Sequence, residues 1–446
     1  MAVIDTAALF SDWDLDGSYD ESAAVHIQLE GETAVCDSDA VSIDGSRITL
    51  LDEGTYLVSG ALTDGQIVVD AGDTDKVQIV LAGASLTCAD SAAIYSKSAD
   101  KVFLTLAEGT ENTLTNGGSY IAIDENNIDS VVFSKTDLTL NGSGSLTIAA
   151  QAGHGVVSKD ELTITGGSYT VTAAEHGMTG KDSLAVAGGD FTIISGKDGL
   201  HAENADDSAL GFLYVADGTF TITAQGDAVS ASGALQVDGG TFDLTTGGGS
   251  ASVTMTTGDS FAPGGMGGGP GGQDGAPLQG DPPAGGETPP ERPDNSGGQL
   301  PELPAQPSGS ETASAAETAE GTETAEDTVS QKGVKADGAL TINGGTFTVD
   351  SADDCLHSGG ALAVTGGTFT LSSGDDAIHS DDAVTIRAGE FSIPYCYEGV
   401  EGLSVTVEGG AFDVTAHDDG FNAAGGADSS GFGGRDEPFA ASEDSF

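Results

Sequence analysis

The chain has 446 residues, of which 68 are glycine, and its 71 acidic residues against 13 lysines and arginines give a formal net charge of −58. This composition excludes a helical bundle and a basic nucleic-acid-binding protein, and a chain so acidic should instead attract cations. No apolar run approaches the about 20 residues of a membrane span. Met1-Ala2-Val3 does not resemble a signal peptide, so we expect any export signal to be removed or missing from this chain.

Residues 1–47 contain the motif Asp12-Trp13-Asp14-Leu15-Asp16-Gly17, which matches the first half of an EF-hand loop. The match fails at the twelfth position, where Ala23 stands in place of the glutamate that would bind Ca2+ through both oxygens. We therefore interpret residues 1–47 as an acidic N-terminal cap rather than an ion site.

Residues 48–249 contain short strand-like runs. The spacing of these runs is irregular up to about Val157 and regular from Leu162. In the regular part an aromatic residue comes two positions after a turn glycine in each repeat; these aromatics are Tyr169, Phe191, Phe220 and Phe242. We expect the first part of a repeating β-structure here, with a short acidic loop inserted between Glu203 and Leu213.

Residues 250–331 are rich in Gly, Pro, Glu, Thr, Ser and Ala and almost lack aromatic residues, so they cannot bury a core. We predict a disordered insertion that leaves one turn and re-enters the same repeat, which a solenoid tolerates because loop-closure entropy grows slowly with length. Residues 425–446 are similar in composition and are predicted to form a flexible tail.

Residues 332–424 repeat most strictly, with a turn glycine about every 22 residues and an aromatic two positions later. These aromatics are Phe347, Phe369, Phe391 and Phe412. Within one repeat, Leu362, Val364, Phe369, Leu371 and Ile378 alternate with small or polar residues, as in very short strands. One such unit cannot bury its apolar face alone, but identical units stack. The sequence thus predicts an all-β, right-handed parallel β-helix with coils about 4.8 Å apart.

Stacking the repeats places acids in one column, seven residues after each aromatic, and several repeats double the acid. Carboxylates about 4.8 Å apart repel by about 3.5 kcal/mol at an effective dielectric constant near 20, so we expect a hard divalent cation, Ca2+, between them. The alternative is that Asp is there for its turn-forming hydrogen bonds. The predicted metal ligands are Asp198, Asp227, Asp353, Asp354, Asp375, Asp376, Glu398, Asp418 and Asp419.

A second column lies three residues further on. It supplies the candidate carbohydrate contacts His201, Lys335, His357, His379 and Asn422, although a histidine on successive coils can also simply stack on its neighbour. Lys332, Lys335 and Lys197 interrupt or flank the acids. They either neutralise the acids or, if the protein is a lyase, supply the general base. We favour neutralisation, because no arginine accompanies them to hold a substrate carboxylate.

The four cysteines give little guidance. Cys355 and Cys396 fall at different positions of their repeats, which disfavours a disulfide, and a Cys36–Cys88 bridge is left open.

Several motifs together resemble one family, the secreted bacterial β-helical carbohydrate-binding domains, which are distantly similar to the family 9 pectate lyases. The motifs are Phe10-Ser11-Asp12-Trp13-Asp14-Leu15-Asp16, Asp198-Gly199-Leu200-His201-Ala202, Lys332-Gly333-Val334-Lys335-Ala336 and Asp376-Ala377-Ile378-His379-Ser380. The resemblance implies a right-handed β-helix and binding of cellulose and acidic polysaccharides rather than their cleavage. It also implies calcium bound by Asp198, Asp227, Asp353, Asp354, Asp375, Asp376 and Asp419.

Three functions stay open. The leading hypothesis is non-catalytic, calcium-dependent binding of acidic plant-type polysaccharides or cellulose by an extracellular or cell-surface protein. Acidic glycans are favoured because Ca2+ can bridge uronate to aspartate and because exposed aromatics are scarce. The alternatives are a calcium-dependent pectate lyase and a surface adhesin or spacer without a glycan ligand.

Overall fold

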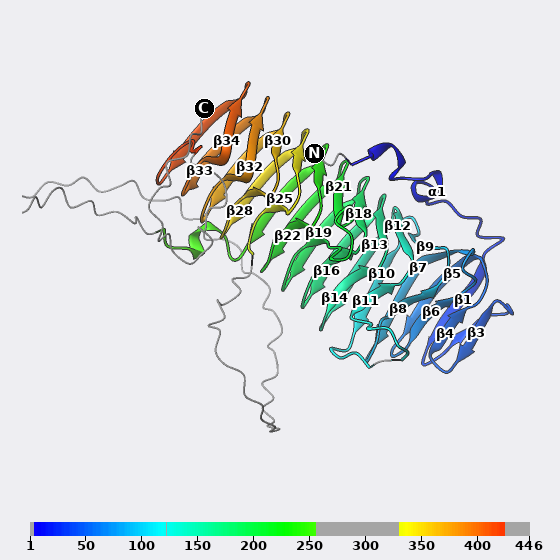
Figure 1. The fold of residues 1–446 in the computed structure, drawn as a ribbon. Coiled ribbons are helices and arrows are strands. Elements are labelled where there is room, and N and C mark those ends of the chain that lie inside the picture. The colour runs from blue at the N-terminus through cyan, green and yellow to red at the C-terminus, as the bar shows by residue number, and fades with distance from the viewer. Residues whose placement is uncertain (1–3, 122, 256–329, 424–446) are drawn as a thin grey trace, which may run out of the picture. The chain divides into compact units, whose positions relative to one another are not determined.

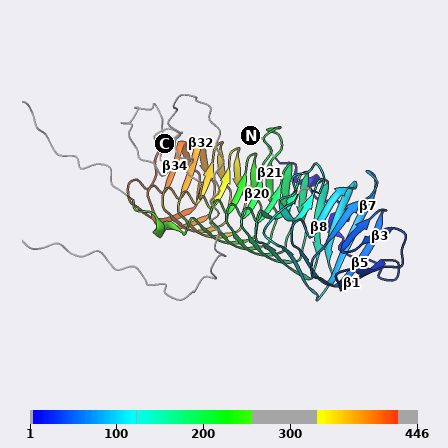
Figure 2. The same ribbon diagram turned by 90° about the horizontal axis from the view of Figure 1, so that it is seen from below.

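The computed structural model describes residues 4–121, 123–255 and 330–423. In this part of the chain nearly every strand pairs in parallel with the strand about one repeat later, so that the coils stack side by side from β1 to β35 (Figures 1 and 2). The fold is a parallel β-helix, as the repeat predicts. None of the helices in the described ranges is long and apolar enough to cross a membrane.

Each coil contributes one strand to each of three faces. Face 1 contains part or all of β1 (Val25–Gly31), β5 (Gly54–Leu62), β7 (Lys76–Cys88), β9 (Lys101–Leu106), β12 (Asp137–Gly142), β15 (Glu161–Ile164), β18 (Ser183–Val186), β21 (Phe212–Val215), β24 (Leu235–Val237), β27 (Leu340–Ile342), β30 (Leu362–Val364), β32 (Ile378–Ile386) and β34 (Val400–Val407).

Face 2 carries the aromatic column. It contains β10 (Glu111–Asn116), β13 (Ser145–Ala150), β16 (Ser168–Ala173), β19 (Asp190–Ser195), β22 (Thr219–Ala224), β25 (Thr241–Thr246), β28 (Thr346–Ser351), β31 (Thr368–Ser373), β33 (Glu390–Cys396) and β35 (Ala411–Ala416).

Face 3 begins just after the acid column. It contains β4 (Arg47–Leu50), β6 (Gln66–Asp70), β8 (Ile94–Ser98), β11 (Ser130–Ser134), β14 (His154–Ser158), β17 (Met178–Gly180), β20 (Leu200–Ala202), β23 (Val229–Ala231), β26 (Val334–Ala336), β29 (Leu356–Ser358) and the first residues of β32 and β34.

The interior is built from columns of identical side chains. Phe242 stacks on Phe347 with ring centroids 4.5 Å apart, and Phe347 stacks on Phe369 at 5.0 Å. The alternating residues predicted to point inward, from Leu362 to Ile378, are indeed buried. Gly345 precedes this column with φ +109°, and a Cβ there would lie 3.1 Å from the Phe347 ring, so glycine meets both the backbone and the packing requirement. All four cysteines are free.

The N-terminal segment differs from the predicted cap. β1 already pairs in parallel with β5, so the helix starts near Val25 rather than at residue 48. The short helices η1 (Thr6–Ala8) and α1 (Asp12–Leu15) instead lie along face 1 (Figure 1). Asp14 is buried there, 2.7 Å from Lys101 Nζ, and accepts a hydrogen bond from Thr139. The EF-hand-like segment is therefore held against face 1 by the buried Asp14. Next in the chain, β2 (Ala34–Val35) pairs antiparallel with β1, and β3 (Val41–Asp44) pairs antiparallel with β4.

The insertion leaves and re-enters at a single turn. After β25 the chain forms η2 (Ser250–Ser252), and it returns through Gln331, whose carbonyl accepts a hydrogen bond from Thr246 Oγ1. β26 then pairs in parallel with β23, as two strands of consecutive coils do. The predicted disordered segment and the predicted tail lie outside the described residues, apart from the ends of the former.

Candidate functional site

The acid column occupies the turn between faces 2 and 3, where its carboxylates join consecutive coils. Oδ1 of Asp198 accepts a hydrogen bond from the backbone N–H of Asp227 at 2.8 Å, and Oδ1 of Asp227 accepts one from Lys332 N–H at 2.7 Å. Asp354 and Asp376 repeat the pattern toward Asp376 and Glu398. One oxygen of each carboxylate is thus used structurally, in a hydrogen bond to the next coil that the sequence does not reveal.

The second oxygen of most column acids faces a cation from the second column. Asp198 Oδ2 lies 2.7 Å from His201 Nδ1 and 3.4 Å from His176 Nδ1. Burial alone would raise the pKa of Asp198, but the two imidazoles lower it. Burial would lower the pKa of His201, whereas Asp198 and Glu203 raise it. Asp227 faces Lys335 at 3.9 Å, so neither acid lies bare.

Lys332 forms the centre of a second cluster. Its Nζ lies 2.6 Å from Asp353 Oδ2 and 3.3 Å from Asp354 Oδ2, and His357 Nδ1 lies 2.8 Å from Asp354. Burial acts to lower the pKa of Lys332, but the two carboxylates raise it above its ordinary value. Asp353, Asp354 and Asp375 also bring carboxylate oxygens within 4.8 Å of one another. This is an all-oxygen group of the kind that Ca2+ prefers, with an ammonium group beside it.

A third cluster lies two coils further on, where acids outnumber cations. Asp376, Glu398 and Glu401 are at most 5% exposed, and His379 Nδ1 lies 3.2 Å from Asp376 Oδ2 and 3.6 Å from Glu401 Oε2. Burial first, and then Asp376, raise the pKa of Glu401 to about 9.

The last coil completes the predicted set. Asp418 and Asp419 are exposed, and Asn422 Nδ2 donates a hydrogen bond to Glu401 Oε1 at 3.2 Å.

The histidines stack as well as pair. The rings of His176 and His201 lie 4.2 Å apart and those of His357 and His379 5.1 Å apart, so part of the second column is a ladder of imidazoles. His201, His357 and His379 each pair with the acid three positions before them, whereas His176 itself lies in the acid column.

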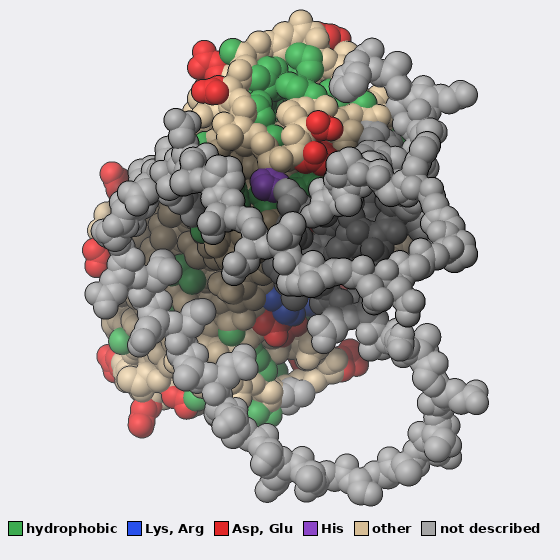
Figure 3. Space-filling model, turned by 90° about the vertical axis from the view of Figure 1, so that its left-hand side faces the viewer, with side chains coloured by type: hydrophobic (Ala, Val, Ile, Leu, Met, Phe, Trp, Pro, Cys, Tyr) green, Lys and Arg blue, Asp and Glu red, His purple; other side chains and the backbone are tan. Residues whose placement is uncertain are grey.

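A pocket of about 230 Å³ opens over the first cluster. We call it the His201–Lys335 groove; its lining includes His176, Lys197, Asp198, His201, Glu203, Asp227, Ser230 and Lys335. Lys197 is half exposed and pairs with Glu175, while Lys335 is 23% exposed and pairs with Asp337. In the view of Figure 3, acidic side chains are spread over the periphery of the molecule, and a small basic patch lies directly beside acidic side chains.

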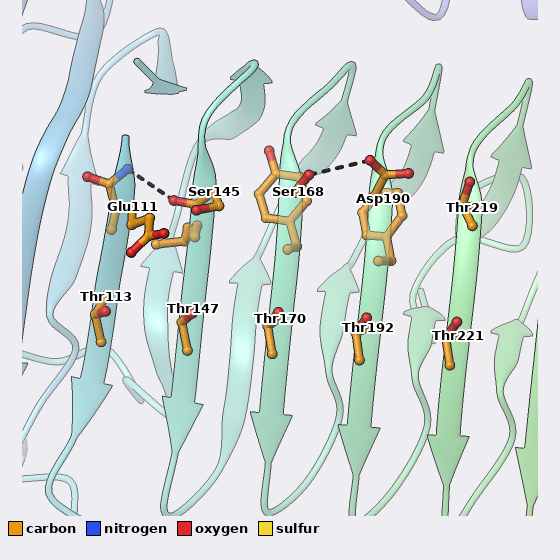
Figure 4. A pocket seen from close by; sticks show the side chains of 14 residues that line it. Glu111, Thr113, Ser145, Thr147, Ser168, Thr170, Asp190, Thr192, Thr219 and Thr221 are labelled. Atoms are coloured by element: carbon orange, nitrogen blue, oxygen red, sulfur yellow. Dashed lines mark hydrogen bonds between the residues drawn. The ribbon is translucent and has the colours of Figure 1, made fainter. Parts of the chain in front are cut away.

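A second groove, of about 370 Å³, runs across the outward-facing surface of face 2. Figure 4 shows hydroxyl side chains in line on neighbouring strands, among them Thr147, Thr170, Thr192 and Thr221. Ser168 donates a hydrogen bond to Asp190 at this surface. The threonine repetition is visible in the sequence, but its exposure follows from the register of face 2.

The structure places the predicted site residues in three clusters, whereas the sequence predicted one continuous column of acids. It brings Asp198, Asp227, His201, Lys335 and Lys197 to one groove. Sequence reasoning missed the contributions of Glu175, Glu203 and Asp337, which lie outside both columns. It also gave Glu401 no role, although Glu401 occupies the second column in register with His379.

The fold and these clusters define a class: a β-helical solenoid protein whose polar turn column forms a charged groove. Residues 44–377 match the family model described as carbohydrate-binding domain-containing protein, so the chain belongs to that family. The resemblance drawn from the motifs is therefore confirmed.

One curated relative, a carbohydrate-binding domain-containing protein of Acetivibrio thermocellus, is 38% identical over 137 residues, which are 30% of this chain and 48% of the relative. The match thus spans about half of that protein. A solved structure described as the polysaccharide lyase-like protein from C. thermocellum, a gadolinium derivative, shares 32% identity, covers 50% of this chain and 92% of its own, and gives a TM-score of 0.49.

Proposed function

We propose that this protein binds polysaccharides without cleaving them, outside the cell or at its surface, and that the His201–Lys335 groove takes acidic glycans. The observation that carries the proposal is the gathering of Lys197, Lys335, His176 and His201 around one groove of a chain that has only 13 lysines and arginines. On a surface of net charge −58, a uronate can approach most easily where the acids are locally neutralised.

The ionisation of the lysines supports binding over lyase chemistry. A general base must lose its proton near the working pH. Asp354 and Asp353 raise the pKa of Lys332, and Asp227 and Asp337 raise that of Lys335, although burial opposes both shifts. Among the described residues that line the groove, none is an arginine that could hold a substrate carboxylate.

Replacing Lys197 and Lys335 together by alanine should weaken binding of polygalacturonate by about 10–100-fold, because each lysine can give a charge-assisted hydrogen bond to a uronate. Calorimetry and affinity electrophoresis would measure this loss, and added salt should weaken wild-type binding. Lys76→Ala, which removes an exposed lysine paired with Asp100 elsewhere, is the matched control and should leave affinity unchanged. An unaffected double variant would contradict the groove assignment, and a rise in absorbance from an unsaturated product would contradict binding without cleavage.

Cellulose is the alternative ligand, and the groove on face 2 is the surface that favours it. Its lining is mostly Ser and Thr, with Glu111 and Asp190 as the charged members, so it offers hydroxyl contacts to a neutral glycan. If the protein is retained on cellulose and the Lys197/Lys335 variant is retained equally, this face rather than the charged groove is the binding site.

We further propose that the protein binds Ca2+ through Asp353, Asp354 and Asp375. Their oxygens fit Ca2+ in donor chemistry, and Ca2+ held there would supply a positive charge near the second column. Cationic side chains face both sets of acids, since imidazoles and Lys335 face Asp198 and Asp227 while Lys332 and His357 face Asp353 and Asp354. What distinguishes the second cluster is that three carboxylates lie within 4.8 Å of one another.

Chelation by EDTA should lower the melting temperature, and free Ca2+ at about 100 times its Kd should restore about 2.7 kcal/mol, because the ion binds only the folded state. Differential scanning calorimetry would measure the shift. The Asp353→Asn/Asp375→Asn variant should lose this response, whereas Asp100→Asn, at an exposed pair, should keep it. If neither EDTA nor Ca2+ changes the melting temperature, these carboxylates only form the hydrogen bonds of the turn and the ion pairs with Lys332.

A further inference from the structure

Among the described residues, the cluster around His379 contains more buried carboxylates than cationic side chains. Asp354 has both Lys332 and His357 as cationic partners. Asp376 and Glu401, in contrast, share the single imidazole of His379, and the side chains of all three are at least 93% buried. An unpaired buried carboxylate is costly, so this place requires a proton or a further cation.

Both ring nitrogens of His379 face carboxylates. Nε2 lies 3.3 Å from Oδ1 of Asp381, an exposed carboxylate, and Nδ1 lies 3.2 Å from Asp376 Oδ2 and 3.6 Å from Glu401 Oε2. A metal ion held between Nδ1 and the two buried oxygens would take the place of a proton on Nδ1, while Nε2 would keep its proton and donate it to Asp381. A carboxylate that holds the far nitrogen of an imidazole is the usual outer partner of a metal-binding histidine.

Glu401 adds an independent sign of a ligand. One of its oxygens accepts a hydrogen bond from Asn422, but within the described ranges no donor lies at hydrogen-bond distance from Oε2, which is fully buried and faces His379.

The spacing fits a small metal ion. The three ligand atoms lie within 4.8 Å of one another, and Nδ1 is 3.2 Å and 3.6 Å from the two oxygens. Ligands about 2.1 Å from a tetrahedral ion are about 3.4 Å apart.

We propose that Asp376, His379 and Glu401 form a buried site for a divalent transition-metal ion of the zinc type, with Asp381 orienting His379. The mixed nitrogen and oxygen donors distinguish it from the all-oxygen group at Asp353, Asp354 and Asp375, since Ca2+ takes oxygen ligands and imidazole suits zinc and its neighbours. The site is independent of the proposed glycan groove.

The test is titration of the full, metal-stripped chain with Zn2+ alone, followed by calorimetry and X-ray absorption. We expect one tight site in the wild type, a spectrum with one imidazole nitrogen and carboxylate oxygens at about 2.0–2.2 Å, and no displacement by excess Ca2+. Glu401→Gln, which keeps shape and should fold, is expected to weaken Zn2+ binding at least about 100-fold, and Asp381→Asn about 10-fold.

His26→Ala is the matched control, because His26 is exposed on β1 and outside the cluster, and it should bind Zn2+ as the wild type does. A proton shared between Asp376 and Glu401 is the competing explanation. It predicts that Glu401→Gln leaves Zn2+ binding unchanged and stability equal or higher. That result, an absorption spectrum without nitrogen, or equal competition by Ca2+ would each overturn the assignment.

Discussion

Replacing Lys332 by methionine should destabilise the β-helix by about 3 kcal/mol, because it removes one partner of a buried ion pair and leaves the other behind. Lys332 and Asp354 are 13% and 4% exposed at their side chains, and Lys332 is the cation that separates Asp227 from Asp354 in the column. Methionine keeps the apolar stem, so the loss reports the charge. Urea unfolding followed by circular dichroism would measure it.

Two companion variants sharpen this test. Adding Asp354→Asn to Lys332→Met should recover part of the lost stability, since the more deeply buried of the two carboxylates that face Lys332 is then neutral, while Asp353, 16% exposed, keeps its charge. Lys76→Met, at an ion pair about 41–46% exposed, should change stability by about 0–1 kcal/mol. Equal effects of Lys332→Met and Lys76→Met would show that the column acids do not need the lysine.

The stability that Asp354 contributes to the fold depends on pH. Burial would raise the pKa of Asp354, but Lys332 and the neighbouring histidines lower it below its ordinary value. Its contribution is therefore present above an unfolded pKa of about 3.9 and is lost as the pH falls toward the folded value.

Replacing Phe347 by alanine should destabilise the protein by about 3–5 kcal/mol, because it removes a buried ring and leaves a cavity between two others. Phe347 is 1% exposed and stacks on Phe242 and Phe369 with interplanar angles of 2° and 8°. Since each coil contacts only its neighbours, the loss should be concentrated near the coils around β28. Chemical unfolding with hydrogen exchange would measure both its size and its place.

Phe412→Ala is the matched control, because Phe412 ends the same column and is only partly buried. It should cost less than half as much as Phe347→Ala. Similar losses at both positions would mean that ring stacking, rather than burial, dominates the column.

Repeat period and side-chain alternation were enough to predict the β-helix, its aromatic interior and the re-entry of the chain after the insertion. In a solenoid every coil makes the same contacts with the next, so each contact recurs at the period of the sequence. The aromatic column from Tyr169 to Phe412 could therefore be read directly from the chain.

The two polar columns were predicted by the same reasoning, but their energetics were not. Alignment superimposes Asp198 on Asp227, yet it cannot show that Oδ1 of one accepts the backbone N–H of the other. Nor can it show that Asp227, Asp354 and Asp376 are buried, so that their charge depends on the partners of each carboxylate.

What the sequence determined by itself is thus the architecture, because stacking obeys a fixed offset along the chain. Only the tertiary structure decided which carboxylates are neutralised, since those partners depend on side-chain direction and on contacts without a period. Lys101 with Asp14 is such a contact. The concentration of unneutralised acid at Asp376 and Glu401 follows from the same cause, because their coils carry one histidine and no lysine in register.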